Sequence, residues 1–270
     1  MTTPWAGGTV LALTLTIGAY GVPRPAGAIS VAEGRVTLDG HEIGANVAGA
    51  PPVAPGQVLA TGQGRAELLL NPGVFLRLAE ESAVKLVASA PDNTRAELLR
   101  GEALVEVLEL GKRDQLEIIN KEAYTHLLKP GLYVFQVEGP TVRVYQGKAQ
   151  VEDDRRIASF SRGKQLTLNT KSMEPQKFDL TENDGLYSWS AQRTRTMAQT
   201  SESMVGNLLA FARGEKYDAG WYWNPWFQAW AFVPAEGYRL SAFGYGFYAV
   251  DAPHSMMPVF ADFRVFSRVP

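Results

Sequence analysis

The sequence has no cysteine among its 270 residues. Disulfide bridges, thiol catalysis and thiolate metal sites are therefore excluded. Histidine is also scarce, and His41, His126 and His254 share no metal-ligand spacing, so we interpret them as unrelated residues. Neither sign of charge dominates, because the sequence has 26 Lys and Arg and 28 Asp and Glu. No long run of residues carries a single sign. Such a balance lacks the basic surface that binds nucleic acid or anionic membrane.

Motifs that carry chemistry are missing as well. No G-x-S-x-G elbow is present, and Gly62-Gln63-Gly64 lacks the third glycine of a nucleotide-binding loop and is expected at a hairpin. Glu152-Asp153-Asp154 lacks the alternating oxygen ligands of a calcium loop. We therefore predict no enzyme and no catalytic, cofactor or metal site. A glycan hydrolase remains an alternative, which would need two facing carboxylates in a cleft lined by Trp221, Trp223, Trp226 or Trp230.

What the sequence does contain is a ladder of short strands over residues 56–168. Apolar and polar residues alternate in most of them: Val74, Leu76 and Leu78 alternate with Phe75 and Arg77. A period of two predicts one buried face and one face in water. Turn residues recur about every 8 to 12 positions, which is typical of a sandwich, a barrel or a β-solenoid.

A weak internal repeat runs through this ladder. The segment GRAEL at 64–68 returns as TRAEL at 94–98, and softer copies begin at Gly34, Gly147 and Gly163. The copies that begin with glycine pair it with a base and then resume the alternation. The pattern predicts repeated hairpin entries in which glycine takes the strained backbone position, but it lacks the fixed period of a solenoid.

These motifs resemble the FecR family, whose members are periplasmic regulators first described for ferric-citrate sensing and related envelope proteins. The matching positions are Gly34-Arg35-Val36, Gly56-Gln57, Leu59, Thr61-Gly62, Arg65-Ala66-Glu67-Leu68, Pro72-Gly73, Leu76-Arg77-Leu78, Leu98-Leu99-Arg100-Gly101-Glu102, Val105, Val107, Val142, Val144, Tyr145, Gly147 and Val151. The resemblance implies a mainly β fold: a FecR-like antiparallel β-sandwich or short β-solenoid over residues 29–170.

Two departures from the family pattern bear on function. Residues 123–134 keep strand character but lose the family's Gly-Thr pair. Signalling members resemble anti-sigma factors with a cytoplasmic segment before a membrane span, whereas about six residues precede the apolar stretch of this chain. The resemblance therefore supports the β-fold more strongly than the sigma-factor mechanism.

The N-terminal segment indicates export. Residues 7–22 are apolar and uncharged, Pro23-Arg24-Pro25 interrupts them, and Ala26-Gly27-Ala28 is an A-x-A cleavage signal. We predict a signal peptide or anchor over residues 1–28 and a bacterial periplasmic, cell-surface or secreted location. No Lys or Arg precedes the apolar stretch, so an apolar strand or a buried helix is the alternative. Membrane contact is expected only through this segment, if it is not cleaved.

The C-terminal part divides into a connector and an aromatic tail. Residues 180–213 predict a broken amphipathic helix with Gly206 in its course, and residues 214–270 form the tail. Thirteen aromatic residues lie within 217–248. They either close the β-domain or form a surface for a partner, because Trp and Tyr dominate binding hot spots. The candidate partner-binding residues are Trp221, Tyr222, Trp223, Trp226, Trp230, Phe232, Tyr238 and Tyr245.

Taken together, these observations predict a non-enzymatic exported envelope protein that acts in protein–protein recognition or self-assembly. A FecR-type transmembrane signalling regulator and a glycan-binding module are the two alternatives. The expected partner is a protein or a second copy of the chain, and a glycan is the further option.

Overall fold

The computed structural model describes residues 26–47, 50–90, 92–154, 156–170, 172–211 and 219–252. Nearly all of the predicted leader lies outside these residues. Ala28, the predicted cleavage position, is fully buried as the first residue of β1. Among the described residues, no helix is long and apolar enough to cross a bilayer.

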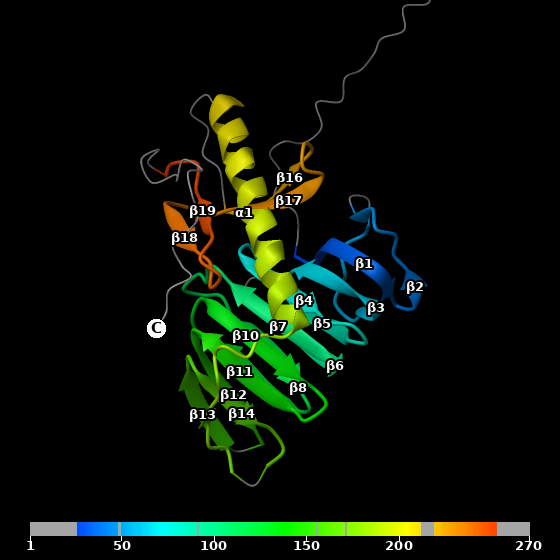
Figure 1. Ribbon diagram of the computed structural model, residues 1–270, viewed down its shortest axis with the longest axis vertical. Coiled ribbons are helices and arrows are strands. Elements are labelled where there is room, and N and C mark those ends of the chain that lie inside the picture. Colours follow the sequence, from blue (N-terminus) through cyan, green and yellow to red (C-terminus); the bar gives the residue numbers. More distant parts are fainter. Residues whose placement is uncertain are drawn as a thin grey trace, which may run out of the picture.

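The described chain is mainly β with one long helix, which confirms the predicted fold class (Figure 1). Its elements are β1 (Ala28–Leu38), β2 (His41–Glu42), β3 (Val58–Leu69), β4 (Val74–Leu78), β5 (Ala83–Ala90), β6 (Asn93–Arg100), β7 (Glu102–Val107), β8 (Leu116–Asn120), β9 (Ala123–Leu127), β10 (Gly131–Gln136), β11 (Thr141–Gln146), β12 (Lys148–Asp153), β13 (Arg156–Ser161), β14 (Lys164–Thr167), β15 (Gln176–Lys177), α1 (Gly185–Phe211), β16 (Gly220–Asn224), β17 (Ala229–Val233), β18 (Tyr238–Leu240) and β19 (Gly246–Tyr248).

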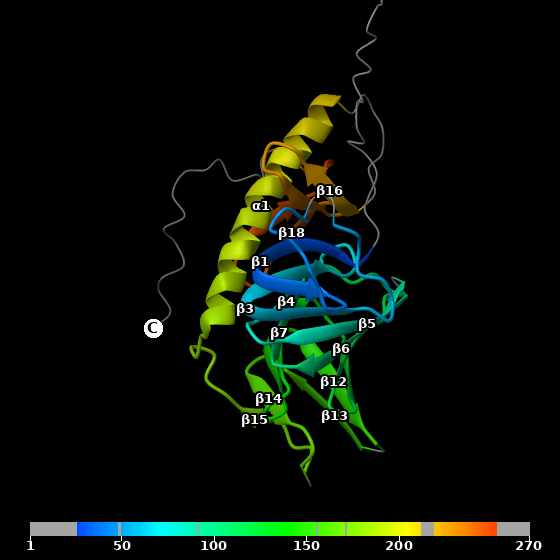
Figure 2. The same ribbon diagram turned by 90° about the vertical axis from the view of Figure 1, so that its right-hand side faces the viewer.

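The first fifteen strands form one hydrogen-bonded sheet. Its order is β13-β12-β9-β8-β6-β5-β3-β4-β7-β10-β11-β14-β15, with β1 and β2 joined beside β3. The sheet doubles over, so the arm ending in β13 and the arm ending in β15 lie on opposite sides (Figure 2). Between the arms lies the main apolar core, which takes Val84 and Ile118 from one arm and Val105 and Phe135 from the other.

One strand pair departs from the expected antiparallel arrangement. β6 and β8 pair in parallel, while the other pairings described for this sheet are antiparallel. The reason is that β7 leaves β6 at Gly101 and crosses to the other arm, where it pairs with β4 and β10. The chain then returns to lay β8 beside β6, and parallel neighbours require such a crossover.

The Gly62-Gln63-Gly64 segment lies inside β3 and not at a hairpin, which corrects the prediction for this segment. Gly64 pairs with Gly34 of β1, beside a shift in the register of the two strands. A Cβ atom on Gly34 would collide with the carbonyl oxygen of Gln63 and lie 2.8 Å from the Cα of Gly64. The glycines of the repeated motif therefore permit a close approach of two backbones at this point.

Helix α1 crosses the outer face of the arm that contains β4, β7 and β10 (Figures 1 and 2). It runs unbroken through Gly206, although a break was expected there. A glycine in a helix interior costs roughly 1 kcal/mol, and the packing of Met204, Val205 and Leu208 against β16 and β17 offsets it. The two aromatic hairpins, β16–β17 and β18–β19, lie beside α1 (Figure 1), and Phe243 in the turn between β18 and β19 contacts Tyr187 at the start of the helix.

Candidate functional site

The eight aromatic residues predicted to bind a partner do not form one surface. Trp221, Tyr222, Trp230 and Phe232 are buried, and Trp223 and Tyr245 are half-buried. Trp221 packs edge-on against Phe75 of β4 at 5.1 Å between ring centroids. These rings join the two hairpins to the sheet and to α1.

Trp226 and Tyr238 remain accessible, with 59% and 39% of their surface exposed. Trp226 sits in the turn between β16 and β17 beside Phe227, which is 49% exposed and was not among the predicted residues. The Asn224 side-chain oxygen accepts the backbone N–H groups of Trp226 and Phe227 at 3.1 and 3.3 Å. The Asn224 amide in turn donates to the Thr200 carbonyl of α1 at 3.2 Å. The turn therefore holds two exposed rings on a fixed backbone, and a role of these rings in partner binding stays a prediction.

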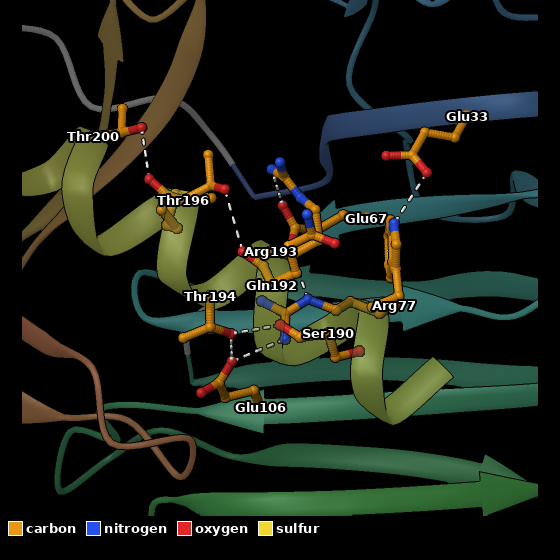
Figure 3. Close-up of polar contacts among 12 residues, drawn as sticks. Glu33, Glu67, Arg77, Glu106, Ser190, Gln192, Arg193, Thr194, Thr196 and Thr200 are labelled. Carbon is orange, nitrogen blue, oxygen red and sulfur yellow. Dashed lines mark hydrogen bonds and ion pairs between the residues drawn. The ribbon is translucent and has the colours of Figure 1, made fainter. Parts of the chain in front are cut away.

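A network of buried charges lies between the sheet and α1 (Figure 3). Arg77 of β4 donates through Nε to Glu67 at 2.7 Å and through Nη1 to Glu106 at 2.9 Å, and all three side chains are fully buried. Arg193 of α1 donates to the other oxygen of Glu67 at 3.1 Å. Thr194 of α1 donates its hydroxyl to Glu106. Two positive and two negative side chains balance in this network, which joins α1 to β3, β4 and β7.

The charged side chains of the network change one another's pKa values. Burial raises the pKa of Glu67, but Arg193 and Arg77 outweigh it, so that the pKa falls to about 2. Burial opposes the charge of Arg77 too, and the two carboxylates keep its pKa above the ordinary value. Burial raises the pKa of Glu106, and the bonds from Arg77 and Thr194 only partly compensate. Arg77 separates the two carboxylates and no solvent reaches them, so the network is suited to holding α1 and not to catalysis.

A second group of carboxylates lies at the start of α1. An open cleft of about 390 Å³ is lined by Glu102, Gln136, Arg143, Glu182, Asn183 and Asp184. Glu102 and Asp184 line the same cleft, and burial together with the nearby Asp184 raises the pKa of Glu102 to about 7. The glycan hydrolase alternative requires two facing carboxylates in a cleft lined by tryptophan. None of the tryptophans lines this cleft, so the arrangement does not support a glycan hydrolase.

Within the described ranges, no group of three or more His, Asp or Glu side chains is placed to hold a metal ion. The residues of the network were missed at the sequence level because the alternation assigned Phe75 and Arg77 to a face in water. Every residue of β4 is buried, since α1 covers that face. The sequence held one indication of this network: the charged residues Glu67, Arg77 and Glu106 each stand among the apolar residues of a strand.

Comparison with known proteins confirms the family resemblance. Residues 57–150 match the model of the FecR protein family. Two similar solved structures are each described as a "putative anti-sigma factor" from Parabacteroides distasonis. The first is 16% identical, with a TM-score of 0.39, and the alignment covers 50% of this chain and 63% of that protein. The second is 12% identical, with a TM-score of 0.39, and covers 66% and 98%.

The chain thus spans less than two thirds of the first of these structures. No curated protein matches the chain.

Proposed function

We propose, from the FecR-like domain formed by residues 57–150, that this chain is a non-enzymatic signalling regulator that acts by binding proteins at the bacterial envelope. The family match is the observation that carries the proposal, and it favours regulation over a purely structural role. The buried carboxylates Glu67 and Glu106 are paired with Arg77, which supports a structural role for them and not a catalytic one.

The turn between β16 and β17 is the part of the predicted aromatic surface best suited to a partner. Trp226 and Phe227 project from a turn that Asn224 fixes, so little conformational entropy is lost when they bind. Large rigid rings of this kind supply most of the energy in many protein interfaces. The proposal therefore places partner contact at Trp226 and Phe227 and leaves the buried rings to stabilise the fold.

The test is crosslinking in the native cells, with the partner read out by mass spectrometry and the response by transcript levels. We expect Trp226→Ala with Phe227→Ala to lose the crosslinked partner and to change the transcripts. The matched control is Tyr124→Ala with Ile157→Ala, which removes two exposed apolar side chains from β9 and β13. Equal crosslinking in both double variants would show that the turn is not the contact surface.

The same cells separate the alternatives. Transcripts unchanged on deletion of the gene would contradict the signalling role. Light scattering that shows a large homo-assembly, lost only in the Trp226 and Phe227 variant, would favour self-assembly. Binding of the purified protein to glycans through the same turn would favour the glycan-binding module.

A further inference from the structure

The large sheet ends at β13, at β15 and beside β1, and two of these edges are protected. β2 pairs with the end of β1, and the Ile43 N–H after β2 donates to the Val36 carbonyl of β1 at 2.9 Å. β15 is only two residues long and directly follows Pro175. Short strands, proline and covering loops are means by which proteins prevent edge-to-edge pairing.

β13 is the edge that lacks this protection. Among the described residues, β12 is the strand that pairs with it, and their register has no bulge. Residues 157–161 of β13 contain neither proline nor charge. Arg156 at its start donates to the Thr170 carbonyl at 2.8 Å, which ties that end of the strand to the other arm. The rest of β13 lies at the outer margin of its own arm (Figures 1 and 2).

The register of β12 and β13 shows which backbone groups face outward. Asp153 pairs with Arg156 across residues 154 and 155, and the residues that flank such a short turn are hydrogen-bonded to each other. In an antiparallel pair, alternate residues exchange hydrogen bonds with the neighbouring strand. Ile157, Ser159 and Ser161 therefore direct their N–H and C=O groups away from β12. These groups offer donors and acceptors to another strand.

The charges at the two ends of β13 are opposite in sign. Residues 152–156, where the strand begins, include three carboxylates and two arginines and are therefore net negative. The exposed bases Arg162 and Lys164 follow its other end. The exposed Lys148 lies there too, because it pairs with Ser161. Antiparallel pairing of two copies brings the negative end of each strand to the positive end of the other, whereas parallel pairing would bring like charges together.

We propose that two copies of this chain pair antiparallel through β13, so that the large sheet continues from one copy into the other. A second copy fits this edge because the strand is complementary to itself: each copy gives and receives the same contacts about a two-fold axis. The backbone makes these contacts, so alanine substitutions on β13 leave them in place. The inference does not rest on the proposed function, because the β16–β17 turn takes no part in the pairing.

Sedimentation equilibrium of the full chain tests the pairing. We expect a monomer–dimer equilibrium at protein concentrations up to about 1 mM, a range that includes weak complexes. The affinity should fall as salt is added, because salt screens the attraction between the charged ends. A monomer throughout this range would overturn the proposal, and a dimer whose affinity is independent of salt would contradict the antiparallel match of charges.

Ser159→Pro removes an outward N–H from the middle of β13 without removing a bond to β12. It should weaken the dimer at least about tenfold, because each copy loses one donor across the two-fold axis. The matched control Ser159→Ala keeps the N–H and should leave the dimer unchanged. Equal dimerisation of these two variants would overturn the pairing. Trp226→Ala with Phe227→Ala should also leave the dimer unchanged, so this test and that of the proposed function fail independently.

Hydrogen exchange of the unmodified chain decides the matter even if Ser159→Pro fails to fold. The amides of Ile157, Ser159 and Ser161 should exchange more slowly at high protein concentration than at low concentration. The amides of Ala158 and Phe160, which face β12, should change little. Dimerisation without added protection of the outward amides would place the contact elsewhere and overturn the proposal. Protection that requires another envelope protein would replace the second copy with a strand from that protein.

Discussion

Within the described network, Arg77 is the cation that pairs with both buried carboxylates. It is fully buried between Glu67 and Glu106, and it lies 5.1 Å from the Phe75 ring. A buried charge is tolerated only when its partners are well placed, and removal of one partner leaves the others uncompensated. Surface pairs behave differently, because water already solvates both members.

We therefore predict that Arg77→Ala lowers the free energy of unfolding by about 3–5 kcal/mol, since Glu67 and Glu106 would remain buried without their cation. The control is Arg35→Ala, which removes the Glu42 pair whose side chains are 73% and 74% exposed, and it should cost less than about 1 kcal/mol. Urea unfolding measures both. Similar losses in the two variants would contradict the view that burial gives the network its importance.

At the scale of the element, α1 is a helix whose buried face is rich in hydroxyls. Ser190, Thr194, Thr200 and Ser201 are all fully buried. Three of these hydroxyls donate to the backbone carbonyl four residues earlier, at 2.8 to 3.0 Å. Such bonds satisfy a hydroxyl inside the helix, so the helix can bury a polar face. The Ser201 oxygen also accepts the N–H of Phe232 from β17 at 3.0 Å.

Ser201→Ala should destabilise the protein by about 1–3 kcal/mol, because the buried N–H of Phe232 would lose its acceptor. Thr196→Ala is the matched control. Thr196 is half-buried, and its hydroxyl donates to the Gln192 carbonyl at 3.2 Å. Alanine favours the helix at that position, so a neutral or slightly stabilising effect is expected. Thermal unfolding of the two variants compares them, and a neutral Ser201→Ala would refute the importance of the bond to β17.

At the scale of the whole molecule, the chain after residue 179 acts as a cover for one arm of the sheet. α1 and the two hairpins bury Leu69 and Phe75 in one cluster and Leu104 and Leu132 in another. A sheet arm with this outer face cannot be left in water without a large apolar patch. The FecR-like domain and the C-terminal part therefore share their apolar contacts.

A chain that ends at Asp179 should consequently bind a dye for apolar surfaces and self-associate, which fluorescence and light scattering would show. A chain that ends at Ala252 retains α1 and both hairpins, and it should remain dye-negative and unassociated. A well-behaved monomer ending at Asp179 would mean that the β-domain does not need this cover.

The local signals of the sequence determined the β-ladder, the FecR resemblance and the aromatic tail, because strand periodicity and turn chemistry act between near neighbours. The sequence also predicted the mainly β class. It could not show that β6 and β8 pair in parallel, since that depends on where β7 crosses. Nor could it assign Arg77 and Phe75 to an interior, because α1 lies more than a hundred residues later in the chain. Whether a strand face is buried depends on the element that packs against it. Only the tertiary structure could therefore show that Arg193 joins Glu67, Arg77 and Glu106. The same holds for Glu102 and Asp184, which line one cleft.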